Sequence, residues 1–270
     1  MEESPPVDLG LADRACIITG GSRGIGLEVA RKLTTDQATV LLVGRREDAL
    51  RAAAAQCGGS ERARWLALDV TTADAGDRVS EACIDHFGHI DVLVNGASMT
   101  TARALEHLTD EDWQAYWEIN VMAPMRLMRA CVPAMTQQGW GRIVNVSSSS
   151  GKRPGQRNVA YSVSKAAELS LSRAYADVYA RHGVLINAVA PGPVASELWL
   201  EPGGLADQGA DQQGVTREQV LDAAAAALPI RRLATAEEIA NVIVFLCSEA
   251  ASNVVGAAWS VDGGAIPVII

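Results

Sequence analysis

Short apolar segments alternate with amphipathic stretches of helical length along most of this chain. The predicted strands are residues 15–19, 39–43, 64–68, 92–95, 142–147, 185–190 and 258–261. An alternation of this kind indicates βαβ units that stack around a parallel sheet. The pattern therefore predicts an α/β fold: a doubly wound, Rossmann-like, seven-stranded parallel sheet with helices on both faces.

Capping signals and one irregular segment complete the predicted organisation. The acidic turn at 109–112 predicts the start of a long helix through Gln137, and 235–238 resembles a capping box before a helix over 239–246. Segment 196–228 falls outside the alternation and is rich in Gly, Gln, Asp and Ala. A long segment of this kind over the carboxyl edge of a parallel sheet is usually either a binding lid or a disordered loop, and we expect a lid. Residues 1–10 are predicted to be a flexible tail and residues 11–270 a single domain.

Composition narrows the classes of function. The 270 residues are 49% hydrophobic and 20% charged, with a net charge of −9. This negative net charge argues against binding to nucleic acid and disfavours binding to anionic membranes. With no basic, apolar leader at the start and no apolar run of about 20 residues, we expect a cytoplasmic protein. The five cysteines are scattered, so we expect buried thiols and no metal site.

A glycine-rich turn follows the first predicted strand. In Thr19-Gly-Gly-Ser-Arg-Gly-Ile-Gly26 the glycines allow backbone N–H groups at a helix N-terminus to approach a pyrophosphate. An ordinary βα turn could have the same composition, and the spacing differs from G-x-G-x-x-G. The predicted dinucleotide contacts of this turn are Gly20, Ser22, Arg23, Gly24, Ile25 and Gly26.

The second predicted strand ends at Arg45 and Arg46. In many dinucleotide sites a carboxylate stands there and binds the adenosine 2′-hydroxyl. Two guanidiniums can instead bind a 2′-phosphate bidentately, and Arg23 would be a third cation at that end. The two arginines could also simply open an exposed helix. We expect NADP(H) in preference to NAD(H).

Tyr161 and Lys165 stand four residues apart, which places them on one face of a helix. A cation beside a phenol favours the phenolate, so the tyrosine can donate and accept a proton near neutral pH. The same spacing also occurs on ordinary, partly exposed helices. Lysine is scarce here, however, since the chain contains only Lys32, Lys152 and Lys165.

Taken together, these motifs resemble the short-chain dehydrogenase/reductase family, in its single-domain form of about 250 residues. The resemblance covers residues 12–264, and the family's T-G-x-x-x-G-x-G turn matches residues 19–26. It implies a catalytic tetrad of Asn120, Ser148, Tyr161 and Lys165. The further cofactor contacts that it implies are Asp69, Val70, Asn95, Ala97, Tyr161, Lys165, Pro191, Gly192 and Val194.

Two departures from the family pattern are visible. The family's Asn-Asn-Ala-Gly is Asn95-Gly-Ala-Ser98 here, and we expect Ser98 to crowd the cofactor side of the cleft. Ser196 replaces a usual threonine and keeps the hydroxyl. The resemblance also implies a homotetramer, or a homodimer, that pairs helices around 112–137 and 158–182, and the apolar ending 266–270 would suit an interface.

The predicted function is hydride transfer between NADP(H) and a carbonyl or secondary alcohol, with Tyr161 as general acid/base. A 3-oxoacyl substrate on an acidic carrier protein is a narrower version. Related carrier-protein reductases tend to have basic residues just before the fifth strand and at the end of the tyrosine helix. Residues 137–140 and Arg181-His182 supply only one firm cation there, which weakens this version. The loop cations Lys152, Arg153 and Arg157 could meet an acidic substrate or be solvated. The alternative is a catalytically silent dinucleotide sensor or scaffold, which predicts a damaged tetrad, whereas all four positions are intact. The substrate is left open; segments 99–103, 149–157 and the lid would select it.

Overall fold

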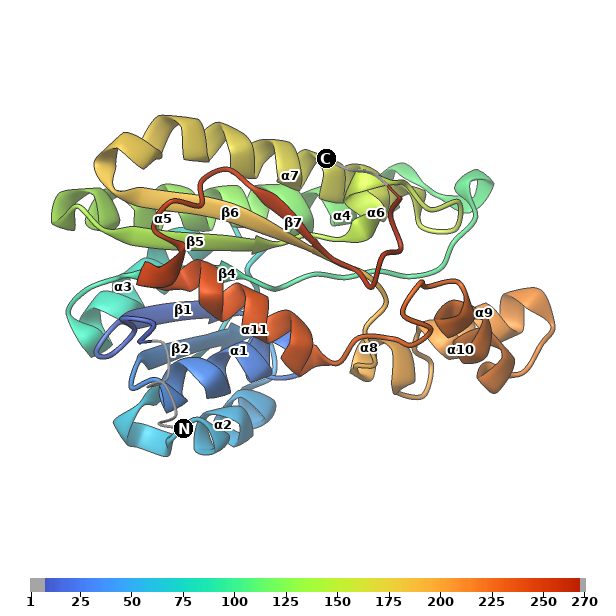
Figure 1. The fold of residues 1–270 in the computed structure, drawn as a ribbon, viewed down its shortest axis with the longest axis horizontal. Coiled ribbons are helices and arrows are strands. Elements are labelled where there is room, and N and C mark those ends of the chain that lie inside the picture. Colours follow the sequence, from blue (N-terminus) through green and yellow to red (C-terminus); the bar gives the residue numbers. More distant parts are fainter. Residues whose placement is uncertain (1–7, 268–270) are drawn as a thin grey trace, which may run out of the picture.

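Residues 8–267 are described by the computed structural model. Seven parallel strands form one sheet in the order β3-β2-β1-β4-β5-β6-β7 (Figure 1). The strands are β1 Ala15–Thr19, β2 Thr39–Gly44, β3 Ala63–Ala67, β4 Val92–Asn95, β5 Gly141–Val146, β6 Val184–Pro191 and β7 Ala258–Val261. All seven predicted strands are present, with ends displaced by at most one residue, so the predicted α/β fold is confirmed.

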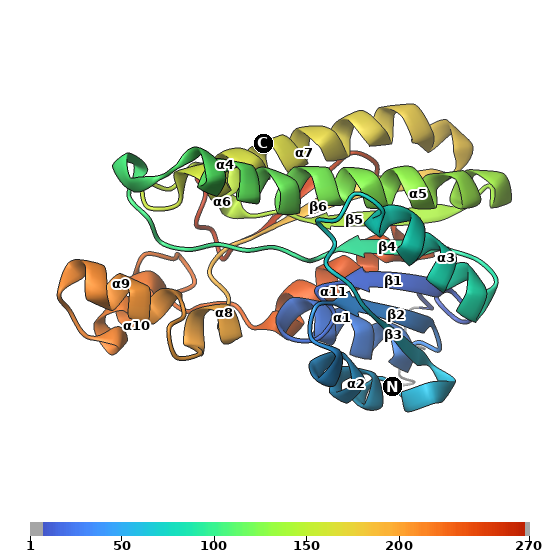
Figure 2. The same cartoon turned by 180° about the vertical axis from the view of Figure 1, so that it is seen from behind.

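Helices cover both faces of the sheet (Figures 1 and 2). One face carries α1 Gly24–Thr35, α2 Glu47–Gln56 and α11 Ala236–Cys247, and the other carries α3 Ala75–Phe87, α5 Ala123–Gln138 and α7 Val159–Tyr179. Successive strand residues point to opposite faces, so Cys16 and Ile18 pack against the first group while Ala15 and Ile17 pack against the second. Each face therefore has its own hydrophobic core.

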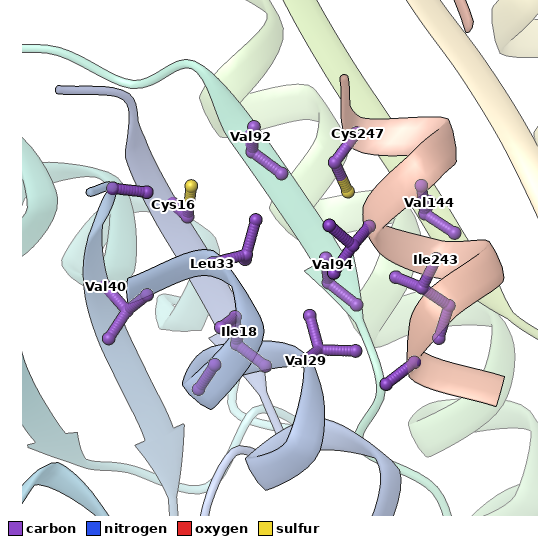
Figure 3. Close-up of a cluster of buried hydrophobic side chains, with 14 of the residues drawn as sticks. Cys16, Ile18, Val29, Leu33, Val40, Val92, Val94, Val144, Ile243 and Cys247 are labelled. Carbon is purple, nitrogen blue, oxygen red and sulfur yellow. The ribbon is translucent and has the colours of Figure 1, made fainter. Parts of the chain in front are cut away.

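Figure 3 shows the core beneath α1 and α11. Val29 and Leu33 of α1 meet Ile243 of α11 above the side chains of β1 and β4, and all three are fully buried. Burial of each such side chain contributes about 1.5–3 kcal/mol. All five cysteines are free and buried, as expected. This packing fixes α1, and with it the turn that precedes it, against the sheet.

The long helix predicted through Gln137 is divided in the structure. It consists of α4 Asp110–Trp117, the π-helical turn η3 Glu118–Met122, and α5. Thr109 and Asp112 form a capping box at the start of α4. A π turn inserts one extra residue into the helix and often marks a functional site. The inserted turn here contains Asn120.

The segment expected to be a lid is helical and extends beyond the carboxyl edge of the sheet (Figure 1, right). It consists of α8 Glu197–Leu200, α9 Leu205–Gln213 and α10 Arg217–Ala226. The remaining short elements are η1 Gly59–Glu61, η2 Leu105–His107, α6 Ser149–Lys152, η4 Ala180–His182 and η5 Glu249–Ala251. The capping box predicted before α11 is present, between Thr235 and Glu238.

The first and last residues of the chain fall outside the range that the structure describes. Residues 1–7 of the predicted tail lie outside the described residues, as do residues 268–270 of the apolar ending. Leu9 packs against the core, and its carbonyl oxygen accepts a hydrogen bond from the Glu249 N–H at 3.0 Å. Between residues 8 and 267, no helix is both long and apolar enough to cross a bilayer.

Candidate active site

The strand order reverses direction at β1 and β4, which is where doubly wound sheets bind ligands. Thr19 pairs with Asn95 across these strands. The Thr19 hydroxyl oxygen accepts hydrogen bonds from the N–H groups of Gly96 at 3.1 Å and Ala97 at 3.2 Å. The two loops that leave the sheet here are therefore fastened to each other.

A cleft of about 1300 Å³ opens above this point. The predicted site residues that line it are Gly20, Ser22, Arg23, Gly24, Ile25, Gly26, Arg45, Arg46, Asp69, Val70, Ala97, Ser148, Tyr161, Pro191, Gly192 and Val194. Asn95, Asn120 and Lys165 do not line the cleft and are buried behind its wall. One cleft thus brings together the glycine turn, the arginines and the tyrosine.

The glycine turn fits a pyrophosphate. Gly20 has a φ of +70°, and a Cβ at Gly26 would stand 2.4 Å from the Gly20 carbonyl oxygen, so a larger residue at either place would force the turn apart. Helix α1 starts at this turn without a side-chain cap and without an acid in its first turn. Its N-terminal N–H groups and positive dipole end are therefore suited to bind an anion.

Arg45 and Arg46 follow β2 and are exposed at the same end of the cleft. Within residues 8–267, neither guanidinium forms a hydrogen bond or an ion pair. Asp69, after β3, accepts hydrogen bonds from the N–H and hydroxyl of Thr71. The bond from the Thr71 N–H lowers the pKa of Asp69, with smaller contributions from the Thr71 hydroxyl and from Arg45. This end of the cleft carries positive charge that is open to solvent.

Arg23 forms an ion pair with segment 196–228. Its guanidinium lies 2.6 Å from a carboxylate oxygen of Glu201, which caps the end of α8. The Glu197 carboxylate, also on α8, comes within 3.3 Å of the place where a Cβ of Gly24 would stand. Two carboxylates of segment 196–228 therefore lie beside the turn that suits an anion.

Ser148 and Tyr161 present hydroxyl groups to the cleft from different elements. Ser148 follows β5, and its Oγ accepts a hydrogen bond from the Ser150 N–H at 3.1 Å, which leaves the hydroxyl proton available for a substrate oxygen. Tyr161 lies in the first turn of α7 and is half-buried. The ring of Tyr116 packs edge-on against it, with centroids 6.3 Å apart.

Lys165 lies beneath Tyr161 with its side chain only 1% exposed. The ammonium is 5.9 Å from the centre of the Tyr161 ring and donates to the Val146 carbonyl oxygen at 2.8 Å. It also donates to Glu168 at 2.9 Å, one helical turn further along. Burial raises the pKa of Glu168, and the Lys165 ammonium opposes that rise.

Glu168 was not among the residues predicted from the sequence. A signal was present: Glu168 follows Tyr161 by seven residues and Lys165 by three, so all three share one helix face. A carboxylate on a face that must pack against a sheet needs a partner.

Asn120 is fully buried in the π turn. Its side-chain oxygen accepts a hydrogen bond from the Ser98 hydroxyl at 2.8 Å, and its amide donates to the Ser164 hydroxyl at 3.0 Å. Ser164 in turn donates to the Tyr161 carbonyl oxygen at 2.8 Å. Ser98, which was expected to crowd the cofactor side, lines the cleft and uses its hydroxyl to hold Asn120.

Segment 196–228 is fastened by hydrogen bonds to the loop after β4. The Ala102 N–H donates to Gln208 at 2.9 Å, and the Ala102 carbonyl oxygen accepts from Gln212 at 2.7 Å, both on α9. Next to it, the N–H of Thr101 donates to the Tyr116 hydroxyl at 3.1 Å. The sequence signal for this clamp on Ala102 was two glutamines four residues apart in segment 196–228, which place two amides on one helix face.

Comparison with known proteins shows the family of this chain. The family model described as short chain dehydrogenase matches residues 14–202. Sorbitol dehydrogenase from Cereibacter sphaeroides is 33% identical over 94% of this chain and 98% of its own length. A 3-oxoacyl-[acyl-carrier-protein] reductase from Aquifex aeolicus is 28% identical over 96% of this chain and 99% of its own length.

A solved structure shares the overall fold. The structure of L-sorbose reductase from Gluconobacter frateurii complexed with NADPH and L-sorbose superposes with a TM-score of 0.89, at 34% identity, over 97% of this chain and 100% of that one. The chain therefore belongs to the short-chain dehydrogenase/reductase family of NAD(P)-dependent oxidoreductases that act on CH–OH groups.

Proposed function

We propose that this protein is an NADP(H)-dependent ketone reductase, or secondary alcohol dehydrogenase, with Tyr161 as its general acid/base. The observation that carries the proposal is that Tyr161 and Ser148 line the same cleft as the glycine turn, with Lys165 buried directly beneath the phenol. When bound, the nicotinamide supplies the hydride that reaches the carbonyl carbon.

The side chains of the protein would position the carbonyl and supply its proton. The Ser148 hydroxyl, whose oxygen already accepts the Ser150 N–H, donates a hydrogen bond to the carbonyl oxygen. The Tyr161 phenol donates a hydrogen bond to the same oxygen and then its proton. Lys165 favours the phenolate that results, and Asn120 holds the helix of Tyr161 in place through Ser164. A water held near Asn120 would return the proton through Lys165.

Preference for NADP(H) over NAD(H) is part of the proposal. Arg45 and Arg46 stand free at the cleft, and residues 44–46 contain no carboxylate that would repel a 2′-phosphate. The L-sorbose reductase that shares the fold was solved with NADPH. The cofactor contacts would come from the glycine turn, Asp69 and Val70, Asn95 and Ala97, and the segment 191–194, with Lys165 anchoring the nicotinamide ribose.

The substrate class is best tested by a screen of NADPH and NADH oxidation with purified protein. The panel would contain simple ketones, keto sugars such as L-sorbose, and 3-oxoacyl thioesters, with alcohols and polyols in the oxidation direction. Keto sugars are included because two relatives are named for sorbitol and L-sorbose. We expect turnover with at least one carbonyl class and faster turnover with NADPH than with NADH.

The alternative, a silent sensor or scaffold, predicts a different result in the same screen. It would bind NADPH tightly and turn over no carbonyl or alcohol in the panel. Tight binding without any turnover would therefore replace the proposed function.

A homotetramer is a further part of the proposal. Trp117 of α4 and Val163 and Val178 of α7 are large hydrophobic side chains that are 42%, 42% and 48% exposed in the single chain. They lie on the helices that the family resemblance pairs between subunits, and exposed apolar area of this kind favours association. Sedimentation of a monomer at micromolar concentration would contradict it.

A further inference from the structure

Glu168 is a carboxylate that the proposed reaction does not use, and it is as deeply buried as the lysine beside it. The side chains of Lys165 and Glu168 are each 1% exposed, and the ammonium and carboxylate are 2.9 Å apart. Among the described residues, the ammonium's other partner is the carbonyl oxygen of Val146, at 2.8 Å. The positive charge under the proposed acid/base is therefore paired with a negative charge on the same helix.

This pairing changes the electrostatic field that Lys165 exerts on the Tyr161 phenol. The Lys165 ammonium lies 5.9 Å from the centre of the Tyr161 ring, a separation at which a lone cation favours the phenolate. A carboxylate 2.9 Å from that cation cancels much of its field at the ring, and burial makes both interactions stronger than they would be in water. An ionised Glu168 therefore weakens the effect of Lys165 on Tyr161.

Several charged groups on elements packed against α7 have partners elsewhere, and Arg129 of α5 acts on Tyr175, whose pKa it lowers against the rise caused by burial. Tyr116 of α4 is the titratable group that touches the Tyr161 ring. Those with partners away from the pair are Lys152 of α6, bonded to the Ala258 carbonyl oxygen and Ser260; Glu118 of η3, paired with Arg126 of α5; Asp112 of α4, paired with Arg103; Arg142 of β5, paired with Glu249; and Arg181 of η4, bonded to His182. Within residues 8–267, Glu168 is the one carboxylate that pairs with Lys165.

We propose that Glu168 is a positioning residue that neutralises the Lys165 ammonium and thereby sets the pH at which Tyr161 changes from proton donor to proton acceptor. The proposal rests on the proposed function, because it assigns Glu168 a role through Lys165 and Tyr161. Under this proposal the pH–activity profile of the enzyme depends on a charge that contacts neither substrate nor cofactor.

The test is the pH dependence of Glu168→Gln. The amide oxygen of the substituted side chain still accepts a hydrogen bond from the ammonium, but the negative charge is gone. We expect the midpoint of the pH–rate profile to move to lower pH by about one unit, a tenfold change in proton concentration, for both alcohol oxidation and carbonyl reduction. A purely structural role would lower the rate at every pH and leave the midpoint in place.

Glu168→Asp is the matched control, because it keeps the carboxylate and shortens its stem. Its midpoint should stay near that of the wild type. A shift as large as that of Glu168→Gln would overturn the proposal, since the charge would then not be responsible. An unmoved midpoint in Glu168→Gln, or a move to higher pH, would overturn it equally.

A cofactor-free measurement separates this proposal from the proposed function. The tyrosinate absorbance of each protein is titrated, and the curve of its Tyr161→Phe counterpart is subtracted to isolate one phenol. That phenol should ionise at lower pH in Glu168→Gln than in the wild type, and equal midpoints would contradict the proposal without any turnover being measured. If the amide variant does not fold, Glu168→Met removes the same charge while filling the volume, and the same shift is required of it.

Discussion

Charged side chains are buried at one end of the cleft and exposed to solvent at the other. At the proposed proton-transfer end, Lys165 and Glu168 are withdrawn from water and held by hydrogen bonds within α7 and to β5. At the proposed phosphate-binding end, the Arg23 and Glu201 side chains are 45% and 52% exposed, and Arg45 is open to solvent. Burial makes an interaction strong and geometrically fixed, whereas exposure makes it weak and exchangeable.

This difference separates chemistry from cofactor choice. Removal of one partner from a buried ion pair is strongly destabilising, so the proposed proton-transfer end should tolerate few substitutions. An exposed arginine can exchange a carboxylate partner for a phosphate with only a small change in free energy. Substitutions at the first end should therefore remove turnover and stability, and substitutions at the second should adjust cofactor binding while turnover survives.

The largest effect apart from loss of the phenol itself is expected for Lys165→Met. Turnover should fall by about 10²–10⁴-fold, because the phenolate loses its cation. The free energy of unfolding at neutral pH should fall by about 3–5 kcal/mol, since the Glu168 carboxylate is left buried without a partner. Denaturant unfolding and steady-state kinetics measure the two losses separately.

The double variant Lys165→Met with Glu168→Leu is the control for that experiment. It replaces the pair with apolar side chains, so stability should return towards the wild-type value while turnover stays lost. Recovery of turnover together with stability would mean that Lys165 serves the fold and not the reaction.

Ser148→Ala should have the next largest effect. Loss of one donor to the developing negative charge on oxygen lowers kcat by about 10²–10³-fold in comparable sites. NADPH affinity should be unchanged, because Ser148 is placed on the substrate side of the reaction. A loss of affinity that accounts for the whole decrease in rate would contradict the assigned role.

Replacement of both Arg45 and Arg46 by alanine should change cofactor preference. We expect NADPH affinity to fall by about 10–100-fold, the equivalent of about 1.4–2.8 kcal/mol, with NADH affinity nearly unchanged. Titration of the cofactor by protein fluorescence measures both. Arg51→Ala, which removes an exposed charge of α2 that does not line the cleft, is the matched control.

Glu201→Gln should have the smallest effect. It frees Arg23 from an exposed ion pair, and such pairs contribute about 0–1 kcal/mol, so NADPH affinity should rise by at most about fivefold. NADH affinity should rise less if Arg23 binds the 2′-phosphate. An equal rise for both cofactors would instead place Arg23 on the pyrophosphate that they share.

The sequence predicted those parts of the molecule that depend on local pattern. The strands are predominantly apolar segments between turns, and the capping box of Thr235 and Glu238 is a local signal, so both could be found without the structure. The π turn at Asn120 could not, because one inserted residue hardly disturbs the apolar periodicity of a long helix.

The missed contacts of the site depend on tertiary structure. Arg23 and Glu201 are 178 positions apart, and nothing local to either residue indicates their pairing. The same is true of the clamp that Gln208 and Gln212 place on Ala102. Glu168 lay within reach of sequence reasoning, but a glutamate next to a lysine on a helix usually indicates a solvated face.

The central claim is that Tyr161 transfers the proton while the rest of the cleft binds the cofactor independently. The most direct measurement is NADPH binding and carbonyl turnover by Tyr161→Phe, made side by side on one preparation. The account predicts NADPH affinity equal to that of the wild type and nearly complete loss of turnover. Turnover retained within about tenfold of the wild type, a change of only about 1.4 kcal/mol in the barrier, would contradict it.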